Sequence, residues 1–294
     1  MTKILVTGAA GLIGHRVMEK LSPDQEVAGL YYRIKPQSNL KRYYQVDLCQ
    51  RQDVHSVLDS LRPSVLIHCA ASCQPGFCEQ HPLETMSINL GGTMYLASWA
   101  AAHECFVVHV STDLVFDGSQ GDYGEEDPVS PISLYGWSKV AAEEAVKSSG
   151  AAYCIVRTAL VYGHSPGGNR GADEVLIDNW KRGNATPLFV DEYRTPTAVG
   201  ELAEKLIEIA RQRITGLIHV AGGTRLSRYD FGRKIADLFE FPSQLLIPRR
   251  REEVHSIPPR APDVSMNITK ARSLFNTPFR GIEENLRLEH NLPL

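Results

Sequence analysis

Three glycines between an apolar run and a helical segment constrain the fold of this 294-residue chain more than any other feature. The run KILVT has the length and β-branched content of a strand, and Leu12 begins the helical segment. Gly8, Gly11 and Gly14 occupy the junction. Glycine lets the backbone turn sharply and approach a phosphate, and a helix amino terminus offers unpaired N–H groups to an anion. The junction predicts a phosphate-binding turn that includes Leu12 and Ile13; a tight structural turn is the alternative.

Short β-rich runs alternate with helical segments over the first 160 residues. Further strands are expected at EVAGLYY, YYQVD, SVLIHCA, FVVHVS and YCIVRT, and helices near Leu12, Gln52, Leu83 and Tyr135. Strands separated by helices run parallel with right-handed crossovers, and functional groups gather at their carboxyl ends. We therefore predict an α/β fold, a Rossmann-type doubly wound parallel sheet with a smaller C-terminal substrate-binding lobe.

The pattern loosens after about Leu160. We predict an NAD(P)-binding Rossmann domain over 1–160 and a substrate-binding lobe over 161–294, partly interleaved with the first. A helix is expected from Ala172 to Arg182, and TAVGELAEKLIEIARQR has the spacing of a packing helix. The strand near 216–221 is expected to join the main sheet.

Composition and charge exclude several classes of partner. A formal net charge of -3 provides no basic field for nucleic acid or an anionic membrane. There is no run of about 18 apolar residues and no leader-like opening, so we expect a cytoplasmic protein. The six cysteines form no CxxC pair, and the cluster between positions 69 and 78 matches no zinc spacing. We expect no metal.

The end of the second predicted strand indicates which dinucleotide is preferred. An NAD site places an acid there, whereas this chain has Tyr31, Tyr32 and Arg33. A guanidinium suits a 2′-phosphate, so we expect NADP(H) to be preferred and NAD(H) to be the second choice. The alternative for Arg33 is an ordinary surface arginine. Asp47 at the end of the third strand is placed to meet the adenine amino group, and a helix cap is its alternative.

Tyr135 and Lys139 are four residues apart at the start of a predicted helix, so they share one face. The preceding strand leads to Ser111 and Thr112 at the same crevice. An ammonium beside a phenol stabilises the phenolate and lowers the phenol pKa towards neutrality. We predict that Tyr135 donates a proton to a carbonyl oxygen, Thr112 orients that oxygen and Lys139 also binds the nicotinamide ribose. A surface tyrosine and lysine are the alternative.

These motifs together resemble the extended short-chain dehydrogenase/reductase family along nearly the whole chain. TGAAGLIG is similar to its cofactor loop, VDLCQ to its adenine contact, RPSVLIHCAA to its fourth strand and YGWSK to its catalytic helix. Within the family, STDLVFDG and SPISLYGWSK resemble the dTDP-4-dehydrorhamnose reductase branch. The resemblance implies a triad of Thr112, Tyr135 and Lys139. Around the cofactor it implies the three glycines, Asp47, Leu48, Ala70 and Ala71.

The resemblance also implies an activity, the NAD(P)H-dependent reduction of a 4-keto-6-deoxy nucleotide sugar, and a homodimer as the family's usual assembly. Arg194 and Arg260 are candidates to meet the nucleotide diphosphate, with ordinary ion pairs as the alternative. Leu160 stands where the rhamnose-forming reductases usually carry Trp, and Arg194 stands where they carry glycine. These departures leave the sugar open.

Two other functions are consistent with the motifs. The regulatory β subunit of methionine adenosyltransferase resembles the same branch, keeps the Tyr and Lys and binds NADP without obvious turnover. A nucleotide-sugar epimerase or dehydratase would retain its cofactor through the cycle. Dehydratases usually add an acid pair beside the triad threonine, and Asp113 alone follows Thr112 here.

Overall fold

The protein is described from a computed structural model, in which residues 3–21, 26–36 and 42–293 are placed. Its centre is a parallel sheet of seven strands in the order β11-β6-β5-β4-β1-β2-β3. The strands are β1 (Lys3–Thr7), β2 (Glu26–Tyr31), β3 (Arg42–Gln45), β4 (Val65–His68), β5 (Phe106–Thr112), β6 (Tyr153–Thr158) and β11 (Gly216–His219). The order reverses between β1 and β4, which is where such sheets form a ligand crevice.

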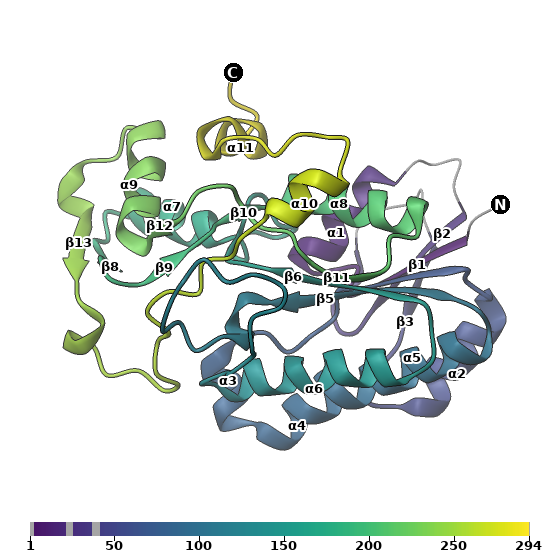
Figure 1. The fold of residues 1–294 in the computed structure, drawn as a ribbon. Helices are drawn as coiled ribbons and strands as arrows, with labels where there is room; N and C mark the ends of the chain where they lie inside the picture. The colour runs from purple at the N-terminus through teal and green to yellow at the C-terminus, as the bar shows by residue number, and fades with distance from the viewer. Residues whose placement is uncertain (1–2, 22–25, 37–41, 294) are drawn as a thin grey trace.

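Helices cover both faces of the sheet (Figure 1). One face carries α1 (Leu12–Lys20) and α8 (Val199–Gln212), which pack on each other. The opposite face carries α2 (Arg51–Leu61), α5 (Gly92–Ala102) and α6 (Leu134–Ser148). This arrangement confirms the predicted Rossmann-type, doubly wound α/β fold.

The two faces have separate apolar cores because successive strand residues point to opposite sides. On β1, Val6 joins the core that includes Val17 of α1 and Leu206 of α8. Its neighbour Leu5 joins the core that includes Leu58 of α2. Strands β4 and β5 are buried along their whole length, as expected for parallel strands covered on both faces.

The second half of the chain builds a lobe at one end of the sheet and also contributes β11, which pairs with β6. The lobe has its own apolar cluster, which includes Trp180 and Phe231. Its helices are α7 (Ala172–Lys181), α9 (Arg228–Leu238) and α11 (Ile282–Glu289). Its strands pair as β8 (Thr186–Phe189) with β13 (Leu246–Arg249) and β9 (Tyr193–Arg194) with β12 (Leu226–Ser227), and β7 (Val161–Tyr162) pairs with β10 (Thr197–Ala198). The division at 160 remains a prediction.

Several element boundaries differ from the sequence-based expectation. The helix expected near Leu83 is a succession of α3 (Pro75–Gln80), α4 (Pro82–Met86) and the π-helical turn η1 (Ser87–Gly91), which continues into α5. Strand β3 ends at Gln45, so Asp47 lies beyond it. The remaining short elements are η2 (Asp113–Val115), η3 (Ser243–Leu245), η4 (Arg251–Glu253) and α10 (Thr269–Leu274).

No helix in the described part of the chain has the length and apolar character needed to cross a membrane.

Candidate active site

In the glycine turn after β1, Gly8 and Gly14 have no room for a side chain. Gly8 has a φ of +67°, and a Cβ there would lie 2.8 Å from the Ala70 amide nitrogen. A Cβ on Gly14 would lie 2.2 Å from the Gly8 carbonyl oxygen. The N-cap of α1 is Gly11, which makes no side-chain cap, so the first amides of α1 remain available to an anion. The geometry fits the pyrophosphate of a dinucleotide.

The other predicted cofactor residues surround this turn or lie near the next strand ends. Leu12 and Ile13 open α1, and Ala71 follows Ala70 directly after β4. The Ala70 amide donates to Thr7 Oγ1 at 3.2 Å, which ties the ends of β1 and β4 together. These contacts place the two alanines at the crevice.

Asp47 and Leu48 occupy the connection between β3 and α2. Asp47 Oδ1 accepts from the Cys49 amide at 2.9 Å, while the N-cap of α2 is Gln50. Asp47 therefore orders a local turn, and the helix-cap alternative is wrong. Leu48 is buried, and a Cβ on Gly92 would lie 2.9 Å from its Cβ.

Arg33 lies just beyond β2 and is exposed, with its guanidinium carbon 5.0 Å from the centre of the Tyr32 ring. Because β2 neighbours β1 in the sheet, Arg33 lies at the strand end next to the glycine turn. The position fits a group that meets the adenosine end of a dinucleotide.

Thr112 and Tyr135 are brought together by close packing of α6 on the chain that follows β5. A Cβ on Gly136 would lie 2.2 Å from the Leu114 carbonyl oxygen, so only glycine permits this approach. Ser133 caps α6 by accepting from the Gly136 amide at 3.1 Å. Tyr135 consequently reaches the end of β5, where its hydroxyl lies beside the Thr112 side chain.

Burial raises the pKa of Tyr135 well above its ordinary value of 10, and the neighbouring Thr112 hydroxyl only partly opposes this rise. The expected lowering of the tyrosine pKa by lysine is therefore wrong for this structure. Tyr135 keeps its proton at neutral pH, which is the state that a proton donor needs.

Lys139 lies one helical turn after Tyr135 and is almost fully buried. Its Nζ donates to His109 Nε2 at 3.1 Å. Burial lowers the pKa of Lys139 to about 8, while the nearby Glu143 carboxylate acts in the opposite direction. Lys139 is therefore mostly charged at pH 7. Thr112, Tyr135 and Lys139 line one end of β5 and the first turns of α6, as the sequence predicts.

The two predicted substrate arginines share one carboxylate. Arg194 Nη2 lies 3.3 Å from Glu192 Oε1, and Arg260 Nη1 lies 3.0 Å from Glu192 Oε2. Arg194 Nε also lies 3.7 Å from Asp113 Oδ2, and Thr112 Oγ1 donates to Asp113 Oδ1 at 3.0 Å. The arginine cluster is therefore connected to the triad through Asp113.

The family model described as "RmlD substrate binding domain" matches residues 1–290. The chain belongs to this family. The expected resemblance to extended short-chain dehydrogenase/reductases of the RmlD-like branch is thereby confirmed.

Relatives of this RmlD-like protein include methionine adenosyltransferase 2 subunit beta of Rattus norvegicus, which is 31% identical over 97% of this chain and 87% of the relative. A "probable low-salt glycan biosynthesis reductase" of Haloferax volcanii is 33% identical over 79% of each chain. Among solved structures, dTDP-4-dehydrorhamnose reductase from Bacillus anthracis in complex with NADP has a TM-score of 0.88 and 25% identity, covering 99% of both chains.

The RmlD-like site contains charged groups that the motifs did not reveal. Burial raises the pKa of Asp113 to about 6 despite the neighbouring Arg194. Arg228, the first residue of α9, has a pKa lowered by burial, and Glu192, Arg194 and Arg260 all influence it. Three guanidinium groups thus gather around two carboxylates. An arginine directly after a short strand was the available sequence signal for Arg228.

Another arginine, Arg170, reaches from the lobe to the glycine turn. Arg170 belongs to the Gly-rich segment after β7, and its Nη1 donates to the Ala10 carbonyl oxygen. The Arg170 amide also donates to Glu174 Oε2 at 3.2 Å, which holds the end of that segment to α7. The contact with Ala10 links the lobe to the glycine turn.

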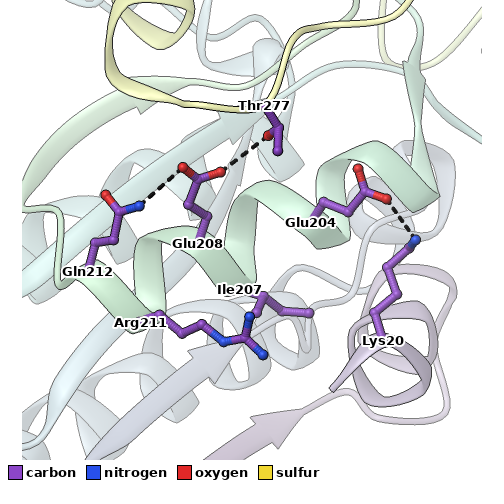
Figure 2. A pocket seen from close by; sticks show the side chains of 7 residues that line it. All are labelled: Lys20, Glu204, Ile207, Glu208, Arg211, Gln212 and Thr277. Atoms are coloured by element: carbon purple, nitrogen blue, oxygen red, sulfur yellow. Dashed lines mark hydrogen bonds and ion pairs between the residues drawn. The ribbon is translucent and has the colours of Figure 1, made fainter. Parts of the chain in front are cut away.

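A surface hollow between α1, α8 and the segment at Thr277 contains none of the predicted site residues (Figure 2). Lys20 and Glu204 form an ion pair of 2.8 Å at its rim. Glu208 Oε2 accepts from Thr277 Oγ1 at 3.2 Å. These side chains satisfy one another, so we assign the hollow no function.

Proposed function

We propose that this protein is an NADPH-dependent reductase that transfers hydride to the carbonyl of a 4-keto-6-deoxy nucleotide sugar. The observation that supports this most is the connection of a protonated Tyr135, beside Thr112, to a cluster of arginines through Asp113. Reduction of a carbonyl uses Tyr135 and Thr112, and binding of a nucleotide diphosphate uses the arginines.

In the proposed mechanism, Tyr135 donates its proton to the carbonyl oxygen as negative charge develops there. Its raised pKa keeps the proton in place until that charge develops. The Thr112 hydroxyl orients the same oxygen. Lys139 carries its positive charge on the same face of α6, one helical turn after Tyr135.

Bound NADPH supplies the hydride. The glycine turn and the amino terminus of α1 would hold its pyrophosphate, and Lys139 its nicotinamide ribose. We assign Arg33 to the 2′-phosphate, which makes NADP(H) the preferred cofactor and NAD(H) the weaker one. The reductase from Bacillus anthracis, crystallised with NADP, supports this choice.

We assign Arg194, Arg228 and Arg260 to the nucleotide diphosphate. Arg194 is buried and also donates to two backbone carbonyls, those of Tyr193 at 2.7 Å and Ala261 at 3.2 Å. These bonds fix the orientation of its guanidinium at the site. Arg260 is paired with Glu192 at 3.0 Å but is 44% exposed, so a ligand can reach its guanidinium.

The test is a panel of nucleotide sugars monitored by NADPH and NADH absorbance. We expect NADPH consumption with a 4-keto nucleotide sugar. Tyr135→Phe is expected to lower turnover by about 100-fold or more, because general acid catalysis contributes about that much, while NADPH affinity changes little. Equal turnover by the variant would contradict the assignment of Tyr135.

A second candidate function is a cofactor-binding regulatory subunit. Its support is the 31% identity with methionine adenosyltransferase 2 subunit beta over 97% of the chain. It predicts tight NADP binding, no turnover across the panel and a co-purifying partner protein. A homodimer remains part of the reductase proposal, and light scattering of the purified protein would test it.

A further inference from the structure

The charge of Lys139 has no carboxylate partner in the described part of the chain. The nearest acid on its own helix is Glu143, one turn further on. Arg157 engages both carboxylate oxygens of Glu143, at 3.0 and 2.8 Å, and Ser111 Oγ donates to it at 2.5 Å. Glu143 is therefore satisfied by other groups, and Lys139 keeps a hydrogen bond to a neutral imidazole instead.

The direction of this hydrogen bond fixes the tautomer of His109. An ammonium group only donates, so Nε2 of His109 must accept and its proton must lie on Nδ1. His109 is fully buried, and Nδ1 has no hydrogen-bond partner. An unsatisfied buried N–H is costly. The unsatisfied Nδ1–H is the cost of directing Nε2 of His109 towards Lys139.

A second histidine packs against the ring of His109. His68 on β4 is paired in register with His109 on β5, and their ring centres are 5.1 Å apart. Thr7 Oγ1 contacts His68 Nδ1 at 2.6 Å. The other nitrogen, Nε2, contacts Thr93 Oγ1 at 3.0 Å, and this hydroxyl donates to the Asn89 carbonyl at 2.6 Å. Both His68 nitrogens are thus satisfied, and the ring is held.

We propose that His109 is a positioning residue for Lys139, which it holds through the hydrogen bond accepted at Nε2 without neutralising the ammonium. A carboxylate in this place would neutralise the charge that Lys139 offers to the cofactor. A neutral acceptor fixes the side chain and leaves the charge available. The catalytic consequence rests on the proposed reductase function, but the hydrogen bond also affects cofactor binding alone.

Loss of the acceptor has a defined effect on the titration of Lys139. The groups that face its Nζ are Glu143 on α6, Cys69 and Cys73 after β4, His109 on β5 and His68 on β4. Burial lowers the pKa of Lys139 to about 8, and the first three groups oppose this. The hydrogen bond to His109 stabilises the ammonium more than the neutral amine, so its removal lowers the pKa further.

The experiment measures NADPH affinity by cofactor fluorescence between pH 6.5 and 9.5. The variants are His109→Leu, which removes the acceptor, and His109→Gln, which can replace it with an amide oxygen. His219→Leu is the matched control, because His219 is another buried histidine on β11 whose Nδ1 contacts the Tyr123 carbonyl at 3.1 Å, not Lys139. Binding of 2′,5′-ADP, which lacks the nicotinamide ribose, is measured in parallel.

We expect the wild-type affinity for NADPH to fall as pH rises through about 8. The fall in His109→Leu should begin about one pH unit lower, which gives a complex about fivefold weaker near pH 8 and about tenfold weaker above pH 9. His109→Gln and His219→Leu should follow the wild type, and 2′,5′-ADP should bind all four proteins equally. If His109→Leu does not fold by circular dichroism, His109→Phe takes its place in the comparison.

A His109→Leu profile that coincides with the wild type would overturn the inference, as would an equal displacement in His219→Leu. Failure of the reductase proposal looks different. In that case the wild type shows no turnover with any nucleotide sugar. The pH dependence of NADPH binding still tests whether His109 positions Lys139.

Discussion

Replacing Glu143 by Gln should destabilise the protein strongly, because it leaves the Arg157 guanidinium buried without its counter-charge. Both side chains are nearly inaccessible, at 1% and 3% exposure. Glutamine keeps the size of the side chain and one acceptor oxygen, so the change mainly removes charge. Breaking one partner of a buried ion pair costs about 3–5 kcal/mol. For a chain of this size such a loss lowers Tm by about 10 °C.

The assay is thermal unfolding of wild type, Glu143→Gln, Arg157→Met and the double variant Glu143→Leu/Arg157→Met. The double variant removes both charges and keeps apolar volume, so it should lie closer to the wild type than either single variant. Ser111→Ala, which removes only the hydroxyl that donates to the Glu143 carboxylate, is the matched control and should cost less, about 1.5–3 kcal/mol.

The same substitution has a second consequence in the active site. The Glu143 carboxylate raises the pKa of Lys139 against the effect of burial. Glu143→Gln should therefore lower the pKa of Lys139 and move the alkaline loss of NADPH affinity to lower pH. A Tm within about 2 °C of the wild type, with an unchanged pH profile, would refute the view of Glu143 as a buried counter-charge.

Three further predictions follow from single positions. Gly14→Ala should lower NADPH affinity more than tenfold in a fluorescence titration, because its Cβ would lie 2.2 Å from the Gly8 carbonyl; unchanged affinity would remove the glycine turn from the cofactor site. Arg33→Gln should weaken NADP binding by about 10-fold or more relative to NAD, since a hydrogen bond to a charged group is worth about 1.5–3 kcal/mol; calorimetry with equal losses for both would contradict the 2′-phosphate assignment. Burial lowers the pKa of His68 to about 3 and of His219 to about 4. Each histidine therefore stabilises the fold fully above pH 6.5 and loses this stability as pH falls towards the folded value, by about 1.4 kcal/mol per pH unit. His219→Gln should flatten the dependence of the unfolding free energy on pH between 6 and 4.5 by that amount, and an unaltered slope would count against a neutral His219.

The parts of the site that could be predicted from the sequence are those that local rules determine. A strand, a glycine turn and a helix must be adjacent in space, so the spacing of Gly8 and Gly14 predicted the tight turn before α1. Tyr135 and Lys139 share a helix face by spacing alone. Thr112 ends the strand that packs against that helix, and its contact with Tyr135 follows from the parallel topology.

The parts that escaped prediction depend on contacts between distant segments. His109 looked like one residue of an apolar strand, and only the packing of α6 shows that it meets Lys139. The pKa of Tyr135 followed burial, which a spacing argument does not measure. Arg194 ends β9, and Arg228 directly follows β12. The two arginines come together because these strands pair, although about 30 residues of sequence separate them.

The central claim is that this protein transfers hydride from NADPH to a carbonyl, with Tyr135 as proton donor. The most direct measurement uses NADPH deuterated at the transferred position, a 4-keto-6-deoxy nucleotide sugar and mass spectrometry of the product. We predict a reduced sugar that carries one deuterium atom per molecule, formed by the wild type and nearly absent with Tyr135→Phe. Tight NADPH binding without any labelled product would contradict the claim and favour the regulatory subunit, and a converted sugar with the deuterium still on the cofactor would indicate an epimerase or dehydratase.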